Sequence, residues 1–379
     1  MTIQLIDLKA QYISIKDEIN SAINRVLDSA CFISGEEVSL FEKEFAGFCR
    51  ARHCAGVSSG TAALHLALLG CEIGPGNEVI TSPNTFIATC EAISHTGAKI
   101  VFVDIEPNTY TIDVEKLEQA ITKQTKAIIP VHLYGHPANM PHILEIAKQY
   151  NLKVIEDAAQ AHGAKVNGQM VGTFGDVGCF SFFPAKNLGS YGDAGGIITN
   201  NNEIAEHVFL LRNHGRASKF IHKIEGFNCR LDSLQASILR VKLKYLSKWT
   251  EIRRKLAANY SDFLKDLPVV LPYEALDCYH VYHLYVIRTC QRDKLRTSLK
   301  EQGIETGIHY PVPLHLQPAY KYLGYNRGDF PVTEKCADEI ISLPLYPELS
   351  KVNQEKVMRE IKNILVEKEK TVLAGGIVN

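Results

Sequence analysis

The sequence predicts an α/β protein whose large domain holds a mostly parallel, mixed sheet between two layers of helices. Short apolar runs alternate with helical patterns through the first 213 residues, which is typical of strands joined by crossover helices. A long amphipathic segment without proline follows over 232–264, and a smaller α+β unit comes after it. A chain of 379 residues can bury one large and one smaller core. We therefore expect a large domain over 1–250, which includes the N-terminal segment, and a small domain over 251–379.

The individual elements are predicted from their apolar spacing. Strands are expected over 78–81, 99–103, 127–131, 153–156, 178–182 and 196–199. Helices are expected over 61–70, 86–96, 115–122, 140–150 and 202–213, and the proline-free segment 232–264 is expected to join the two domains as one or more helices. In the second unit we expect a strand near 283–288 and helices over 292–302 and 333–341.

Lys186 is the first candidate catalytic residue. It lies between two predicted strands, in a segment, 181–196, that is rich in glycine, serine and alanine. Small neighbours let a lysine approach a planar ring closely, as a lysine that binds an aldehyde cofactor must. A solvated loop lysine is the alternative, since most lysines lie on protein surfaces.

Asp157 supports the catalytic interpretation. The segment 154–163 (VIEDAAQAHG) predicts a buried strand that ends in a tight turn, with Asp157 and Gln160 at its carboxyl end, where ligands bind in open α/β sheets. A carboxylate there suits the ring nitrogen of pyridoxal 5′-phosphate (PLP), which it would keep protonated, and Gln160 could contact the phenolic oxygen. The alternative for Asp157 is a helix cap.

A phosphate site is predicted just after Val57. Ser58, Ser59, Gly60 and Thr61 precede an apolar helix, and the free N–H groups and dipole of a helix N-terminus attract phosphate. The Ser181 hydroxyl could add a contact. Helix capping alone would also explain these residues, but the three segments together predict a PLP site.

With these residues in place, the chain resembles the DegT-type family of PLP-dependent nucleotide-sugar aminotransferases, a branch of the fold-type I, aspartate aminotransferase-like enzymes. The resemblance covers almost the whole length. Besides the three segments above, it extends to 5–9, 74–80, 83–89, 130–135, 226–236, 309–318 and 343–347. Two departures are visible: Ala194 stands where the family usually has glycine, and Leu231 where methionine is common. Some relatives have histidine at the lysine position and catalyse dehydration, whereas this chain has Lys186.

The resemblance implies a role for each matching residue. Lys186 would bind the cofactor aldehyde covalently and move protons, Asp157 would pair with the pyridine nitrogen and Gln160 would contact the phenolic oxygen. Phe86 would stack on one face of the ring and Ala159 would lie against the other. Asn228 would complete the phosphate site of a neighbouring subunit, so the active sites would be shared across a homodimer.

The expected reaction is a ping-pong transamination from L-glutamate to a keto-sugar linked to dTDP or UDP, as in amino-sugar and polysaccharide biosynthesis. The segment 309–318, with His309, Tyr310 and His315, is expected to line the substrate pocket, although a proline-fixed turn would also explain it. Together with 343–347 it resembles members that aminate a 3-keto group. A 4-keto sugar or a cyclitol ketone (an inosose) stays open as the substrate.

Composition excludes several other classes of protein. A net charge of −1 offers no basic footprint for nucleic acid or an anionic membrane. The sequence shows no apolar run long enough to span a bilayer and no charged-then-apolar leader at its N-terminus, so we expect neither a membrane span nor a signal peptide, and hence a cytoplasmic protein. The ten cysteines and fourteen histidines are scattered without metal-ligand spacing, so no metal site is expected.

Two other functions are considered. A dehydrogenase would need a glycine-rich dinucleotide motif after its first strand, which the sequence lacks. A regulator that binds PLP without catalysis would retain the same residues but would not exchange amino groups with glutamate.

Overall fold

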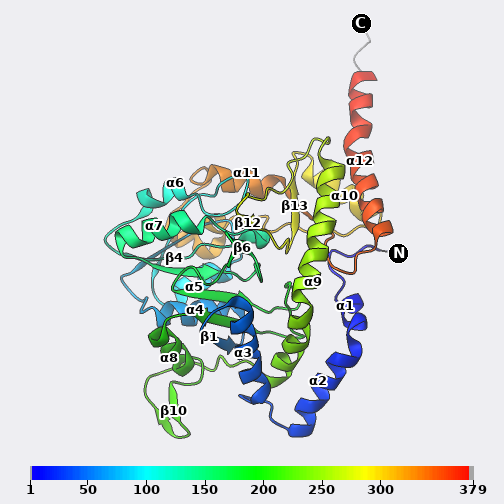
Figure 1. The fold of residues 1–379 in the computed structure, drawn as a ribbon. Coiled ribbons are helices and arrows are strands. Elements are labelled where there is room, and N and C mark those ends of the chain that lie inside the picture. The colour runs from blue at the N-terminus through cyan, green and yellow to red at the C-terminus, as the bar shows by residue number, and fades with distance from the viewer. Residues whose placement is uncertain (1, 375–379) are drawn as a thin grey trace.

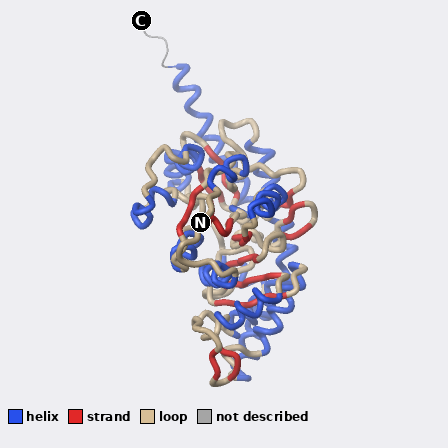
Figure 2. The backbone as a smooth tube through the Cα atoms, turned by 90° about the vertical axis from the view of Figure 1, so that its left-hand side faces the viewer, coloured by secondary structure: helices blue, strands red, loops and turns tan. Residues whose placement is uncertain are grey.

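The computed structural model describes residues 2–374 of the chain, with side chains up to residue 366. Its centre is a seven-stranded sheet in the order β1-β9-β8-β5-β4-β2-β3 (Figures 1 and 2). These strands are β1 (His53–Val57), β2 (Glu78–Thr81), β3 (Lys99–Phe102), β4 (Thr125–Ile128), β5 (Lys153–Asp157), β8 (Val177–Ser181) and β9 (Gly195–Thr199). Only β9 runs antiparallel to its neighbours, so the sheet is mixed and mostly parallel, as predicted.

Helices cover both faces of this sheet. One face is covered by α4 (Gly60–Gly70), α5 (Ala88–His95) and α8 (Asn202–Leu211). The other is covered by α3 (Glu36–Cys49), α6 (Val114–Leu117), α7 (Met140–Tyr150) and the first half of α9 (Ser233–Leu264). Because both faces are buried, the middles of the strands are apolar instead of alternating with polar residues, which stand mainly at the strand ends. This burial explains why short apolar runs were the correct signal for strands.

A second core is built around the C-terminal third of the chain. It contains β13 (Tyr285–Arg288) paired antiparallel with β14 (Ile340–Leu343), together with α10 (Arg292–Glu301) and α12 (Lys351–Ala374). The helix α11 (Pro331–Glu339) packs beside it, where Cys336 joins a smaller cluster with Val286 and Ile340. The predicted helix 333–341 is therefore wrong at its end, because residues from Ile340 onward form β14.

Smaller elements are α1 (Leu8–Ser14), α2 (Lys16–Ser29), β6 (Lys165–Val166), β7 (Gln169–Met170), β10 (Arg216–Ser218), β11 (Ile221–His222), β12 (Cys278–Tyr279), and the 3-10 helices η1 (Glu118–Ala120), η2 (Leu133–Gly135), η3 (Leu314–Leu316) and η4 (Pro318–Leu323).

The helix α9 joins the two cores. Leu239 and Leu246 pack in the first core, whereas Leu256 and Tyr260, further along the same helix, pack in the second. The predicted domain boundary at residue 250 therefore falls inside a continuous helix that belongs to both. The N-terminal segment also crosses between them, because Ile3 pairs with Ile304 and packs in the second core.

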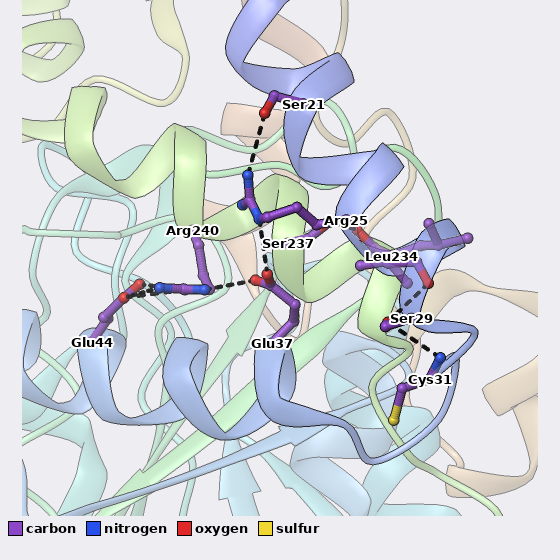
Figure 3. A network of polar contacts seen from close by, with 10 residues as sticks. Ser21, Arg25, Ser29, Cys31, Glu37, Glu44, Leu234, Ser237 and Arg240 are labelled. Carbon is purple, nitrogen blue, oxygen red and sulfur yellow. Dashed lines mark hydrogen bonds and ion pairs between the residues drawn. The ribbon is translucent and has the colours of Figure 1, made fainter.

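Ion pairs fix α9 against the N-terminal helices (Figure 3). Arg240 of α9 contacts both carboxylate oxygens of Glu44 and donates to Glu37 at 2.7 Å, both on α3. Arg25 of α2 approaches the same Glu37 at 3.5 Å. Since these groups are only partly buried, each pair stabilises the fold modestly, and their main effect is to set the register of three helices.

Candidate active site

A cavity of about 490 Å³ opens at the carboxyl ends of the parallel strands, between the two cores. This volume is typical of small-molecule sites. The cavity is lined by nearly all the residues predicted to bind the cofactor: Ser59, Gly60, Thr61, Phe86, Asp157, Ala159, Gln160, Ser181 and Lys186. It is also lined by two of the three predicted substrate residues, His309 and Tyr310.

Asp157 ends β5 and is 5% exposed. Its carboxylate accepts hydrogen bonds from the Thr89 hydroxyl at 2.8 Å and from the Ala159 amide at 3.2 Å. Burial raises the pKa of Asp157, and the bond from Thr89 and the charge of Lys186 oppose that rise. A buried carboxylate in this state is stabilised by a positive charge, such as a protonated pyridine ring.

Lys186 lies in the connection between β8 and β9, where the chain turns back on itself. The Lys186 amide donates to the Phe183 carbonyl at 2.8 Å, and the Ser190 amide to the Phe182 carbonyl at 2.8 Å. At Gly189 a Cβ atom would lie 2.3 Å from the Pro184 carbonyl oxygen, so the turn requires glycine. Burial lowers the pKa of Lys186 to about 8, with Asp157 acting in the opposite direction. The amine is therefore easier to deprotonate than a surface lysine, which a nucleophile needs.

The N-terminus of α4 reaches the cavity beside β8 and β9. Ser59 is the N-cap and its hydroxyl accepts from the Ala62 amide at 3.1 Å. A Cβ atom at Gly60 would lie 2.7 Å from Ser181 Cβ, and one at Gly195 would lie 2.2 Å from the Ser59 carbonyl oxygen. The two glycines thus bring the helix N-terminus close to the sheet edge, and the free N–H groups of the first turn can bind an anion.

Gln160 has its side-chain amide orientation set by its neighbours. Its Oε1 accepts from the Tyr134 amide at 2.7 Å, and its Nε2 donates to the Tyr310 hydroxyl at 3.2 Å. The second N–H of Nε2 is left to donate to a ligand. The Tyr310 ring lies 5.7 Å from Phe86, tilted by 41°, and the Phe86 ring is 54% exposed, as a ring that stacks on a ligand must be.

PLP fits these residues. The cavity holds one buried carboxylate without a salt-bridge partner in the described chain, one lysine with a lowered pKa, an anion site at a helix N-terminus and an exposed aromatic face. These are the groups that a pyridinium, an aldehyde, a phosphate and a planar ring require.

His315 lies outside the cavity, so the prediction that it lines the substrate pocket is wrong. It is 2% exposed, its Nε2 pairs with Glu334 at 3.0 Å and its ring packs against Phe330, 4.8 Å away. It does not line the cavity. Its segment turns into η3 after Pro313, so the histidine holds the turn to α11 instead of facing a substrate.

Asn228 lies outside the cavity of its own chain. It borders an adjoining hollow with Ile33, Ser58, Asp193 and Arg230, and Asp193 lines both spaces. Within one chain, Asn228 is therefore near the anion site but does not line the cavity that contains Lys186.

Sequence reasoning missed several polar residues of the site, among them Thr89 and His283. Thr89 was part of a family-like segment and His283 of a predicted strand, but neither was assigned a role. Both are polar residues inside otherwise apolar runs, and that interruption is the signal that could have identified them.

Comparison with known proteins supports this geometry. The DegT/DnrJ/EryC1/StrS aminotransferase family matches residues 13–362. Over 95% of its length the chain is 49% identical to the "pleiotropic regulatory protein" of Geobacillus stearothermophilus, covering 98% of that protein. It is 44% identical to the dTDP-3-amino-3,4,6-trideoxy-alpha-D-glucose transaminase of Streptomyces venezuelae, with 95% of each chain covered. It is also 44% identical to the UDP-N-acetyl-3-dehydro-alpha-D-glucosamine 3-aminotransferase of Acidithiobacillus ferrooxidans, with 96% and 98% covered.

Solved structures agree with the sequence comparison. The crystal structure of S. venezuelae DesV superposes with a TM-score of 0.95 at 44% identity, covering 96% of this chain and 99% of that one. NtdA of Bacillus subtilis, solved with bound cofactor PMP, superposes with a TM-score of 0.89 at 35% identity, covering 96% of this chain and 86% of that one.

Proposed function

Because the chain belongs to the DegT/DnrJ/EryC1/StrS aminotransferase family, whose members use PLP, we propose that it transfers an amino group from L-glutamate to a 3-keto sugar linked to dTDP or UDP. The observation that carries the proposal is the cavity in which Lys186 faces Asp157 beside an anion-binding helix N-terminus. The sugar class follows the two relatives named as transaminases of 3-amino sugars, one with dTDP and one with UDP.

Each residue of the cavity has a separate role in the proposed transamination. When bound, PLP supplies an aldehyde that condenses with amines and a ring that accepts electrons from the carbon being deprotonated. Asp157 would hold a proton on the ring nitrogen through its negative charge. The neutral amine of Lys186 would remove the proton from the α-carbon of glutamate and pass it to the cofactor, and in the second half-reaction it would return a proton to the carbon that receives the amino group. The Gln160 amide and the α4 N-terminus would orient the ring and the phosphate.

The second copy of the chain is part of this proposal. Asn228 borders the hollow next to the cavity, and large apolar side chains are exposed around the two spaces: Ile33, Phe86, Phe183. Exposed apolar residues around a site favour coverage by a partner. We propose a homodimer in which Asn228 of one subunit contacts the phosphate held by the other.

A cytoplasmic location is also proposed. All ten cysteines are free thiols and six are buried, which suits a reducing compartment. In the part of the chain that the structure describes, no helix combines the length and the apolar character needed to cross a bilayer.

The visible absorption spectrum tests the function. Purified protein with PLP should show the band of the lysine-bound cofactor, the band should bleach on adding L-glutamate, and one member of a panel of keto sugars should restore it. The panel contains dTDP- and UDP-linked 3-keto and 4-keto sugars and an inosose. If only a 4-keto sugar or the inosose restores the band, that ketone replaces the 3-keto sugar as the substrate. If neither glutamate nor any other amino donor bleaches the band, the protein is better described as a PLP-binding regulator.

A further inference from the structure

His283 places an imidazole in the wall of the cavity, and the backbone around it is held from two sides. The neighbouring Val281 and Leu284 amides donate to carbonyls of the β4–α7 connection. The Arg253 guanidinium of α9 lies 3.4 Å from the His283 carbonyl oxygen and donates to the Leu345 carbonyl at 2.8 Å. The ring is therefore a fixed feature of the cavity, at 6% exposure.

The hydrogen bonds of Asn187 set the tautomer of this imidazole. Asn187 directly follows Lys186, and its Nδ2 donates to the Val281 carbonyl at 3.1 Å. That bond orients the amide so that its Oδ1 faces His283 Nδ1 at 3.2 Å. Because an amide oxygen only accepts hydrogen bonds, Nδ1 must carry the proton, and Nε2 is left with a free lone pair.

The ring is also neutral. Burial lowers the pKa of His283 well below its ordinary value, and the charges of Lys186 and Arg253, followed by His309 and His162, act in the same direction. Asp157 and Asp193 also line the cavity, but neither is among the groups that shift the pKa of His283.

His283 Nε2 has no hydrogen-bond partner among the described residues, and Lys186 Nζ does not donate to it. The Tyr310 hydroxyl and Gln160 Nε2 line the same cavity and are both able to donate: the hydroxyl already accepts from Gln160, and burial raises the pKa of Tyr310, so it stays protonated. His283 thus adds a neutral acceptor to a cavity in which the Tyr310 and Gln160 side chains can donate.

We propose that His283 Nε2 accepts a hydrogen bond from a hydroxyl of the keto sugar close to its reacting carbonyl, and so selects hydroxylated ketones. This rests on the proposed function. The carboxylates of glutamate and the phosphates of a nucleotide present only acceptors, whereas a sugar hydroxyl is the donor that a lone pair requires. A site built to pair with a substrate hydroxyl discriminates strongly against ligands that lack it.

The two half-reactions separate this role from others. His283→Leu should slow the return of the cofactor band with the best keto sugar by about 10-fold to 100-fold, the loss of one buried hydrogen bond. Bleaching by L-glutamate should stay within about threefold of wild type, because glutamate offers no hydroxyl. His283→Gln should recover much of the ketone half-reaction, since its Oε1 can accept near the position of Nε2, and His142→Leu on the exposed face of α7 is the control for a remote change.

Equal slowing of both half-reactions would overturn the proposal in favour of proton exchange with Lys186, and an unchanged ketone half-reaction would overturn it outright. A readout without activity is the ¹⁵N spectrum of histidine-labelled, cofactor-free protein. We expect the His283 resonances of a neutral ring protonated at Nδ1. A ring protonated at Nε2, or an imidazolium at neutral pH, would refute the proposal even in a fully active enzyme. If L-glutamate does not bleach the cofactor band of the wild-type protein, the proposed function is refuted. The ¹⁵N spectrum then still tests the tautomer and charge of His283.

Discussion

Asp157 and Thr89 form the residue pair on which electron withdrawal in the cavity depends. The carboxylate is buried and depends on hydrogen bonds to stay ionised, and the Thr89 hydroxyl supplies one of them at 2.8 Å. Charge near a cofactor ring matters most in a site that excludes water.

We expect Asp157→Ala to reduce kcat by about 100-fold or more, because the ring nitrogen loses its ion pair. Steady-state transamination with L-glutamate measures this. Turnover like that of the wild type would contradict the assignment of Asp157.

Thr89→Val is the gentler test of the same pair. Removing the hydroxyl removes a hydrogen bond that lowers the pKa of Asp157, so that pKa should rise further. Because activity requires the carboxylate, it should fall at a higher pH than in the wild type as the solution is acidified. A pH profile of kcat whose acid limb does not move would show that Thr89 does not act through Asp157.

Lys186 gives a second pH dependence. Its pKa is lowered to about 8 by burial, and only the neutral amine attacks an aldehyde. The rate at which cofactor-free protein gains the visible band with PLP should therefore rise with pH and level off above about 8, while Lys186→Ala should gain no band and no activity. Stopped-flow absorbance checks both, and a rate that still climbs tenfold per pH unit at pH 9 would indicate an ordinary lysine pKa.

At the scale of elements, α9 positions the loop that carries Lys186. Lys242, 1% exposed on this helix, donates to the Gly189 carbonyl, and its Nζ lies 5.1 Å from the centre of the Tyr191 ring. About two turns earlier on α9, Gln235 accepts from the Tyr191 amide at 2.9 Å. Two side chains of one helix therefore hold the end of the loop.

Lys242→Met should loosen that loop. Burial lowers the pKa of Lys242 to about 7, against a weaker opposing effect of Glu348. Between about pH 7 and the ordinary lysine value near 10.4, the unfolded chain binds a proton that the folded chain does not. Unfolding free energy should therefore rise with pH in this window in the wild type relative to the methionine variant. Urea titrations of both proteins at pH 7 and pH 9.5 measure the free energy of unfolding. If this free energy changes equally with pH in the wild type and in the methionine variant, the amine of Lys242 is exposed to solvent. Glu72→Gln on an exposed site supplies a control for a surface charge change.

At the scale of the whole molecule, the cavity lies between two cores that α9 joins, and Asn228 borders a hollow beside it. If Asn228 acts on the partner's phosphate, two inactive variants should complement each other. Lys186→Ala and Asn228→Asp, unfolded together and refolded, should regain about a quarter of wild-type activity, because half of the dimers are mixed and one of their two sites is intact.

Either variant refolded alone is the control and should stay inactive. A mixture with no more activity than the two controls would place Asn228 in the site of its own chain, or outside any site.

Much of this protein could be predicted from local signals. The helix 140–150 was predicted to the residue, because Asn139 caps its start, Pro141 suits its first turn and Asn151 ends it in the left-handed region. Lys186, Asp157 and the serine-glycine turn were identified because small residues and strand ends are visible in the chain itself. The end of α11 was missed, since Ile340 joins β14 only by pairing with β13, more than fifty residues earlier.

The sequence by itself therefore determined the layers of the fold and the cofactor chemistry, and it supplied the residues that we propose carry that chemistry, because these depend on periodicity and on residue types within one short segment. Only the tertiary structure decided which other polar groups face the cavity. It buried His315 against Glu334, brought Thr89 to Asp157 and fixed the tautomer of His283 through Asn187. Each of these contacts joins residues at least 19 positions apart, and contacts of that kind are set by how helices and strands pack, which no local pattern encodes.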